Sequence, residues 1–404
     1  MSAVDVIVAG AGPVGLVAAN VLADAGVKVL LLEADTKVPT NLRASTFQPS
    51  TLDMLDRFDV TAPLMAMGVK SPVMQYRDRK GWVASFDFAV LADDCHHPYR
   101  VQCEQFRLCQ LLAERLQSLP NARILFGTEA LEVVANHAAG ANSGVSVKVN
   151  ENGIAGELQA RWLICADGGK SALRKSIGIE LEGFTWPERF LVASTDFDFT
   201  QVMPDLSTVS YFADPQEWYF LLKVPGMWRV MFPVGEQEQD EDILSDAGIN
   251  RRLQRVHARS TPYALKHRTI YAVHQRVAPT YRNGAAFIAG DAAHLNNPLG
   301  GMGMNGGIHD GFAIAERLAG VICGKLPETC LDDYERERRP VALEYVNKIT
   351  IANKRNLEAK DPGQYAQWQD SMDRTAADPA LARQYLLKVS MIESLRNARA
   401  SLQS

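Results

Sequence analysis

A glycine-rich turn near the N-terminus, with glycines at its first, third and sixth positions, separates an apolar run at 4–9 from an alanine-rich run at 13–25. The apolar run predicts a buried parallel strand, and the alanine-rich run predicts a helix. The first glycine permits the tight turn, the second admits a pyrophosphate to the backbone, and the third allows close helix packing. Free N–H groups at the helix N-terminus favour an anion. The predicted phosphate-binding residues are Gly10, Gly12, Pro13, Val14 and Gly15.

A second apolar run, at 29–32, ends in Glu33. A carboxylate at the end of the second strand can accept hydrogen bonds from both hydroxyls of an adenosine ribose. A glycine turn alone would also fit an ordinary α/β unit. The strand, the helix and the acidic residue in this order favour a dinucleotide site.

Composition narrows the classes of partner. The chain has 404 residues, a net charge of −5 and ordinary globular hydrophobicity, which predicts two or three domains and argues against binding nucleic acid by charge. No apolar stretch approaches the ~18 residues needed to cross a bilayer. The six cysteines form no CxxC pair or ligand-like cluster, and no basic segment precedes the first apolar run. We therefore expect a cytoplasmic protein with reduced thiols, no metal site and a small-molecule ligand.

Two later motifs also follow predicted strands. The first is the segment 165–171, Cys-Ala-Asp-Gly-Gly-Lys-Ser, and the second is the segment 289–294, Ala-Gly-Asp-Ala-Ala-His, which precedes a proline and glycine-rich loop at 298–305. Together with the N-terminal turn, they make residues 1–350 resemble the class A flavoprotein monooxygenases, the aromatic hydroxylases similar to para-hydroxybenzoate hydroxylase. The segments 97–105 and 183–190 resemble the hydroxyphenylpropionate hydroxylase branch more closely.

The resemblance implies FAD as the cofactor. It implies that Asp291 binds the ribityl chain, that the backbone N–H groups of Met304 and Asn305 face the flavin, and that Pro298 lies beside the isoalloxazine ring. A helix N-terminus there would stabilise the anionic reduced flavin. The other residues that it assigns to the cofactor are Arg43, Gln105, Asp167, Gly290, Gly301 and Gly303. Arg43 also fits a solvated loop arginine, Gln105 fits a residue bonded only to backbone, and His294 fits an architectural role.

The expected fold is α/β. It combines a Rossmann-like FAD-binding domain of the para-hydroxybenzoate hydroxylase type, an antiparallel β-sheet substrate domain and C-terminal helices. The FAD-binding domain is expected at 1–71, 97–180 and 268–350, the substrate domain at 72–96 and 181–267, and a helical tail at 351–404. The substrate sheet is expected mainly from the aromatic-rich segment between Phe190 and Phe232.

The implied activity is that of a single-component monooxygenase. NADH or NADPH reduces the FAD, O2 adds to form a flavin C4a-hydroperoxide, and one oxygen is transferred to a phenolic or heteroaromatic compound. No second GxGxxG motif is present, so the nicotinamide is expected to bind transiently. We expect Tyr211 and Tyr219 to hydrogen-bond the substrate and Arg229 to neutralise a carboxylate, although the tyrosines also fit core positions of an ordinary sheet.

Two other functions remain open on the sequence. A related flavoprotein could run a non-hydroxylating reaction, although the Trp-x-Trp-x-Ile-Pro segment of halogenases is absent. A non-catalytic FAD-binding protein is the second alternative. A homodimer is expected from the prevalence of symmetric pairs among soluble enzymes.

Overall fold

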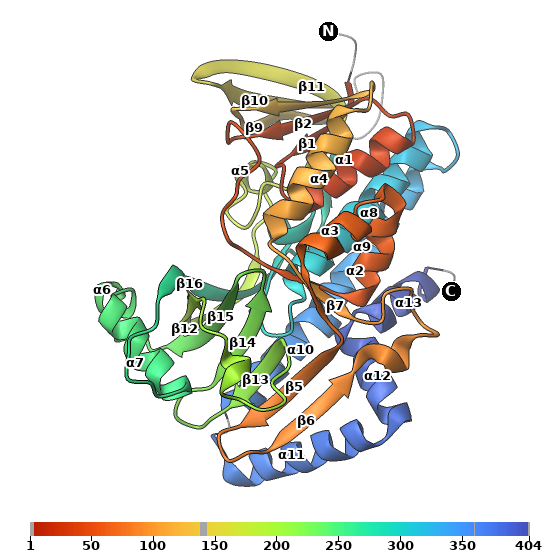
Figure 1. The fold of residues 1–404 in the computed structure, drawn as a ribbon. Helices are drawn as coiled ribbons and strands as arrows, with labels where there is room; N and C mark the ends of the chain where they lie inside the picture. The colour runs from red at the N-terminus through yellow and green to blue at the C-terminus, as the bar shows by residue number, and fades with distance from the viewer. Residues whose placement is uncertain (1–3, 138–143, 359, 403–404) are drawn as a thin grey trace.

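The computed structural model describes residues 4–137, 144–358 and 360–402. Two eight-stranded sheets organise it, one in the upper and one in the lower part of Figure 1. The first sheet has the order β17-β18-β11-β1-β2-β8, with β9 and β10 as an antiparallel extension beside β11. Its strands are β1 (Val4–Ala9), β2 (Val29–Glu33), β8 (Ala122–Phe126), β9 (Thr128–His137), β10 (Gly144–Glu151), β11 (Ile154–Cys165), β17 (Arg282–Asn283) and β18 (Ala286–Ile288).

The central strands of this sheet are parallel, as a βαβ unit requires: β1 pairs with both β2 and β11 in that sense. The helices α1 (Pro13–Asp24), α4 (Gln105–Gln117) and α8 (Gly303–Ile322) pack on or beside it. Helices α1 and α8 approach closely because glycines face α1. A Cβ atom at Gly311 would lie 2.7 Å from the carbonyl oxygen of Val14.

The second sheet has the order β19-β16-β12-β15-β14-β13-β5-β6 and is antiparallel except where β13 pairs with β5. A small sheet, β3-β7-β4, accompanies the two large ones. The strands are β3 (Thr46–Phe47), β4 (Val69–Ser71), β5 (Val73–Asp78), β6 (Val83–Asp87), β7 (Arg100–Gln102), β12 (Glu182–Thr195), β13 (Val209–Ala213), β14 (Tyr219–Val224), β15 (Met227–Val234), β16 (Leu265–Val277) and β19 (His294–Leu295).

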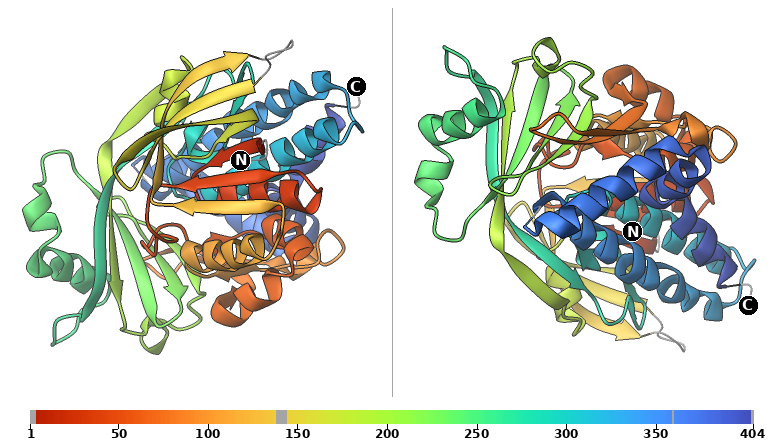
Figure 2. Two further views of the ribbon diagram at one scale, coloured as in Figure 1. Left: turned by 90° about the horizontal axis from the view of Figure 1, so that it is seen from above. Right: turned by 90° about the horizontal axis from the view of Figure 1, so that it is seen from below.

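Both faces of the second sheet are covered. Helices α6 (Asp240–Ile243) and α7 (Asp246–Val256) lie on the outer face, and the C-terminal helices and the first sheet's domain lie on the other side (Figure 2). The C-terminal helices are α10 (Lys348–Glu358), α11 (Pro362–Ala377), α12 (Pro379–Val389) and α13 (Ile392–Ala400). The remaining helices are α2 (Pro49–Leu55), α3 (Thr61–Met67), α5 (Ala172–Ser176), α9 (Asp333–Pro340) and a π-helical segment, Val341–Asn347.

Two details differ from the division expected at the sequence level. The boundary at 267/268 falls inside β16, and the whole of that strand pairs within the second sheet. The described residues of the segment 351–404, which are 351–358 and 360–402, also pack as part of that domain, since Leu386 and Met391 share a hydrophobic core with Phe190 and Tyr211. In the part of the chain that the structure describes, no helix is both long and apolar enough to cross a membrane.

Candidate functional site

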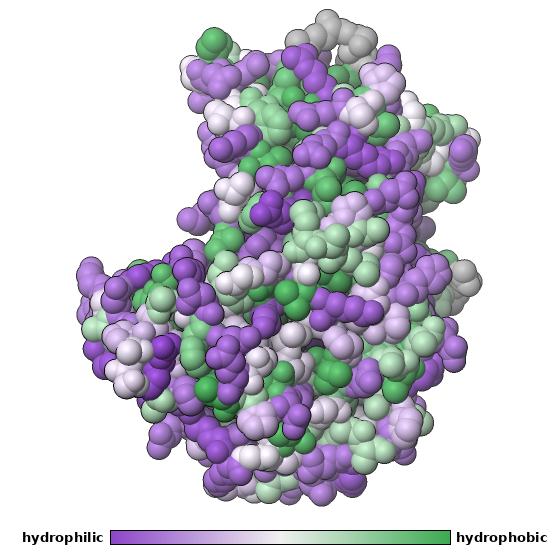
Figure 3. Space-filling view, in the orientation of Figure 1, coloured by the Kyte–Doolittle hydropathy of each residue, from purple (hydrophilic) through white to green (hydrophobic). Residues whose placement is uncertain are grey.

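Two adjoining cavities lie between the sheets. The larger, of about 900 Å³, is bounded by the second sheet, the loop 40–46 and the turn 295–304. The smaller, of about 380 Å³, lies at the carboxyl ends of β1, β2 and β11. Asn41 and Arg43 line both cavities, so the two form one elongated site. In the space-filling view the outline narrows between the upper and lower parts of the molecule (Figure 3).

The glycine turn forms the inner end of the smaller cavity. Gly10 has φ +102°, and a Cβ atom at Gly15 would lie 2.0 Å from the carbonyl oxygen of Gly10. A Cβ atom at Gly12, in contrast, would have no described atom within 4 Å. Among the described side chains, none caps the N-terminus of α1. Unpaired backbone N–H groups therefore meet open space at Gly12, which is the arrangement that binds a phosphate.

Polar side chains line the same cavity, among them Glu33, Gln105 and Asp167. Glu33 accepts hydrogen bonds from the backbone N–H groups of Ala11 (2.7 Å) and Asp35 (3.0 Å), and its carboxylate oxygens have further lone pairs for sugar hydroxyls. Gln105, at the start of α4, lies across the cavity. Burial raises the pKa of the Asp167 carboxyl, and its Oδ1 is buried without a partner in the described chain.

The turn 295–304 supplies the polar end of the larger cavity. Asp291 is exposed to this cavity, and its enclosure by protein raises the pKa of the carboxyl. Helix α8 begins at Gly303 without a side-chain cap from any described residue, so its first N–H groups lack intrahelical partners. Pro298, Gly301 and Met304 line the space in front of them.

Asn305 holds this turn instead of lining the cavity. Its side chain is fully buried, accepts from the backbone N–H of Gln48 (3.0 Å) and donates to the carbonyl oxygens of Thr46 and Gly301 (2.8 and 2.7 Å). The Gln48 side chain adds a hydrogen bond to the carbonyl oxygen of Gly300 (2.8 Å). The Asn305 side chain thus fixes the loop, and only its backbone N–H remains a candidate for the cofactor.

His294 has an architectural role in the structure. Its Nε2 lies 2.8 Å from Oδ2 of Asp310, which also accepts from the backbone N–H of Gly290 (3.1 Å). Arg338 donates to the other oxygen of Asp310 (2.7 Å). Because all three side chains are nearly inaccessible, the cluster anchors the third motif to α8 and α9.

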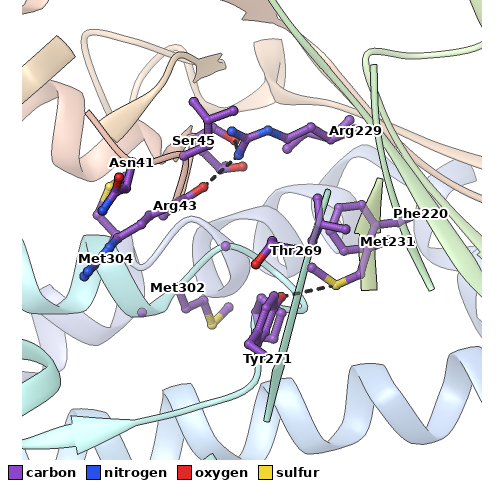
Figure 4. Close-up of a pocket in the computed structure, with 18 of the residues that line it drawn as sticks. Asn41, Arg43, Ser45, Phe220, Arg229, Met231, Thr269, Tyr271, Met302 and Met304 are labelled. Carbon is purple, nitrogen blue, oxygen red and sulfur yellow. Dashed lines mark hydrogen bonds between the residues drawn. The ribbon is translucent and has the colours of Figure 1, made fainter. Parts of the chain in front are cut away.

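One face of the second sheet forms the opposite wall of the larger cavity. The strand register places His267 opposite Ser194, and Ser194 opposite Arg229, in one row across β16, β12 and β15. A second row lies two residues away along each of these strands and includes Thr269 of β16. The wall residues are Val192, Phe220, Leu222, Arg229, Met231, His267, Thr269 and Tyr271. The hydroxyl of Tyr271 contacts the sulfur of Met231 at 3.6 Å (Figure 4).

Arg229 lines the cavity, but its terminal nitrogens are already engaged. Nη2 donates to Oε2 of Glu104 (2.6 Å), and Nη1 donates to the carbonyl oxygen of Arg43 (2.7 Å) and to Oγ of Ser45 (3.4 Å). Figure 4 shows the guanidinium turned toward this loop. A bidentate fork with a substrate carboxylate would need the same two nitrogens. The expected role in neutralising a carboxylate therefore does not fit this geometry.

Neither expected tyrosine lines the larger cavity. Tyr219 points to the face covered by α7, where it stacks on Phe212 with ring centroids 4.5 Å apart. Tyr211 lies on the other face but is buried between Tyr76 and Phe220. Residues alternate between faces along a strand, so Phe220, the neighbour of Tyr219, is the residue that reaches the cavity.

The structure thus gathers most of the residues expected at the cofactor site. Those lining a cavity are Gly10, Gly12, Glu33, Arg43, Gln105, Asp167, Asp291, Pro298, Gly301, Gly303 and Met304. Those behind the walls are Pro13, Val14, Gly15, Gly290 and Asn305. Sequence reasoning did not single out His267, Thr269 and Tyr271, although a spacing of two is the signal for one shared face of a strand.

A separate group of possible metal ligands lies outside both cavities. Ligand atoms of Asp53, Asp56 and His96 are within 4.8 Å of one another. Both carboxylate oxygens of Asp53 already accept backbone N–H groups, from His96 and His97 (3.1 Å each). These hydrogen bonds hold the loop before β7 against Asp53, which accounts for the proximity of the three side chains.

Comparison with known proteins identifies the family. The sequence model of an FAD binding domain matches residues 3–348. The chain is 34% identical to para-nitrophenol 4-monooxygenase of Pseudomonas sp. (strain WBC-3), covering 97% of this chain and 96% of the relative. It belongs to the class A FAD-dependent aromatic monooxygenases. The monooxygenase is also 31% identical to 6-hydroxy-3-succinoylpyridine 3-monooxygenase HspB of Pseudomonas putida (strain DSM 28022 / S16), over 89% of this chain and 90% of the relative.

The structure of p-nitrophenol 4-monooxygenase PnpA from Pseudomonas putida DLL-E4 superposes on the monooxygenase with a TM-score of 0.90 and 32% identity, covering 98% of this chain and 99% of that one. FAD is therefore its cofactor, and the α/β fold expected for it is confirmed. The residues present fit FAD, because the uncovered Gly12 and the uncapped starts of α1 and α8 face the two joined cavities.

Proposed function

We propose that this monooxygenase hydroxylates a single-ring phenol that carries a small uncharged polar substituent, with NADH or NADPH as the transient reductant. The proposal follows from the wall of the larger cavity, where Phe220, Met231 and Tyr271 offer an apolar slot and Arg229, the arginine that the described sheet contributes to this wall, is already paired. It also follows from the similarity to para-nitrophenol 4-monooxygenase over nearly the whole chain.

In this proposal the chain's own residues bind and orient two ligands. Gly10, Gly12 and Glu33 would hold the ADP part of FAD, while Asp291 and the start of α8 would hold the ribityl chain and the flavin edge. When bound, FAD supplies hydride acceptance from the nicotinamide and activation of O2. The sheet wall would orient the aromatic ring and exclude water around it.

The decisive experiment measures NAD(P)H oxidation and O2 uptake by the FAD-loaded enzyme with a panel of phenols. We expect para-nitrophenol and similar uncharged phenols to stimulate both, with one hydroxylated product per NAD(P)H. Stimulated NAD(P)H oxidation without hydroxylated product from any phenol would favour a non-hydroxylating flavoprotein. Failure of either nicotinamide to reduce the flavin under every ligand would favour a non-catalytic FAD-binding protein.

We also propose a cytoplasmic homodimer. All six cysteines are unpaired in the structure, which fits a reducing compartment. The dimer is proposed on the general prevalence of twofold symmetry alone. Light scattering of the purified holoenzyme tests it.

A further inference from the structure

One row across the second sheet, of which His267 and Arg229 line the larger cavity and Ser194 lies between them, contains three buried polar atoms that have no hydrogen-bond partner in the described chain. They are Nδ1 of His267, Oγ of Ser194 and Nε of Arg229. The register places these residues side by side on three neighbouring strands. Buried polar atoms without partners are costly, and a cluster of them beside a cavity indicates a ligand group of complementary polarity.

The row carries a positive charge with a spare donor. Ser194 is fully buried and Arg229 is 6% exposed. The guanidinium donates from Nη1 to the loop and from Nη2 to Glu104, and its Nε–H, which is buried without a partner in the described chain, is a donor that these contacts do not use. Other charged or titratable groups lining the cavity are Arg43, Asp291 and Tyr271. Arg43 and Asp291 also belong to the proposed cofactor side.

His267 lines the cavity with an imidazole whose surroundings favour its neutral form. Burial and the nearby Arg229 both lower the pKa of the imidazole. Of its ring nitrogens, only Nδ1 is shut off without a partner, so Nε2 is the nitrogen on the cavity side. A lone pair on Nδ1 beside a guanidinium is favourable, whereas a buried unpaired N–H there is costly. The proton therefore resides on Nε2.

We propose that His267 and Arg229, the two residues of this row that line the cavity, receive the phenolic oxygen of the substrate as an anion. The inference rests on the proposed function and assigns the oxygen-binding end of its cavity. The Nε2–H of His267 donates to the oxygen, Arg229 stabilises its charge, and the phenolic proton is released to solvent when the ligand binds. His267 thus acts as a donor to the phenolate and does not take up the proton.

The test uses para-nitrophenol, whose phenolate absorbs visible light and whose phenol form does not. The oxidised, FAD-loaded enzyme is titrated with it in the absence of NAD(P)H between pH 5 and 8, and difference spectra report the ionisation of the bound ligand. We expect the bound ligand's pKa to lie below that of free para-nitrophenol by about one unit or more. His267→Leu should abolish most of this shift, and His267→Gln, which keeps an N–H donor, should restore it. His274→Leu, at a histidine of the same strand β16 that does not line the cavity, is the matched control and should leave the shift in place.

Two results would overturn the inference while leaving the proposed function intact. One is an unchanged shift in His267→Leu. The other is a loss of affinity in that variant with no change in the ligand's pKa, which would place the nitro group at the row instead. If His267→Leu does not fold or retain FAD, a measurement of proton release by the wild-type enzyme tests the inference. At a pH below the pKa of the free ligand, binding should release protons to solvent. If no protons are released, the inference is refuted. Absence of binding by every phenol would instead count against the proposed function.

Discussion

Arg229 Nη2 and Glu104 Oε2 lie 2.6 Å apart, in an ion pair that joins β15 of the second sheet to the residue preceding α4. The side chains are 7% and 10% exposed, so neither charge is well hydrated. The pair leaves the sheet wall of the cavity without a free guanidinium fork, and we expect this to influence which phenols are accepted.

Glu104→Gln is predicted to broaden the substrate range toward carboxylated phenols. The change removes the charge that neutralises Arg229, so the affinity for a phenol bearing a carboxylate should rise about tenfold relative to the affinity for para-nitrophenol. Ligand titrations followed by flavin absorbance measure both. Glu132→Gln, in the exposed pair with Lys148, is the control and should alter neither affinity. Unchanged selectivity in Glu104→Gln would show that the pair does not exclude carboxylates.

Two glycine substitutions should separate cofactor binding from stability. A Cβ atom at Gly12 meets open cavity among the described residues, and its φ of −73° suits alanine. Gly12→Ala should therefore leave the melting temperature of the apoprotein unchanged and sharply weaken FAD binding. Gly311→Ala places its Cβ 2.7 Å from the carbonyl oxygen of Val14 and should destabilise the fold by about 1–3 kcal/mol. Thermal melts and FAD titration distinguish the two, and equal melting temperatures would refute the assignment.

Gln275→Leu is predicted to loosen the turn that carries Pro298. The Gln275 amide donates to Asn347 (2.9 Å) and Thr350 (3.0 Å) and accepts from Asn297 (3.2 Å). Removing it leaves buried partners unsatisfied, at a cost of about 1–3 kcal/mol. Chemical denaturation should show this loss, and the flavin absorption spectrum should shift. The exposed Gln237→Leu is the control, and an unshifted flavin spectrum in Gln275→Leu would argue against a positioning role.

His309 is predicted to make the fold sensitive to acid. Burial lowers the pKa of this imidazole to about 3, and its Nε2 lies 2.9 Å from Oγ1 of Thr51. Between about pH 6.5 and 3 the unfolded chain takes up a proton here that the folded chain does not, so stability falls with decreasing pH by up to about 1.4 kcal/mol per unit. His309→Gln should lose this contribution. Denaturation at pH 7 and pH 5 measures it, and identical pH dependence in both proteins would contradict it.

The nucleotide half of the site could be predicted because each of its steps is local. Strand, turn and helix follow one another within the first 25 residues, and the glycine spacing has a direct steric meaning that the contacts of Gly10 and Gly15 reproduce. The later motif at Asp291 follows the same logic. The role of the Asn305 side chain did not emerge, because its partners at Thr46 and Gln48 are more than 250 residues away in the chain.

The substrate wall could not be assigned because the second sheet is buried on both faces. In a strand with one solvent-exposed face, the alternation of polar and apolar residues shows which side chains point inward. Strand β14 lacks this alternation, because it is apolar at nearly every position. Sequence alone therefore did not reveal that Tyr219 faces α7 while Phe220 faces the cavity. The pairing of Arg229 with Glu104 was hidden for the same reason as Asn305, since 125 residues separate the two.

The loop 40–46 is a common wall of both cavities and is tied down by backbone hydrogen bonds from Cys103 and Gln105. When the sites of two ligands share a wall, each ligand changes the binding affinity of the other by the same factor. The apoprotein is therefore expected to bind the aromatic ring with lower affinity than the protein that holds its prosthetic group. The seated ring, in turn, is expected to slow the escape of the prosthetic group.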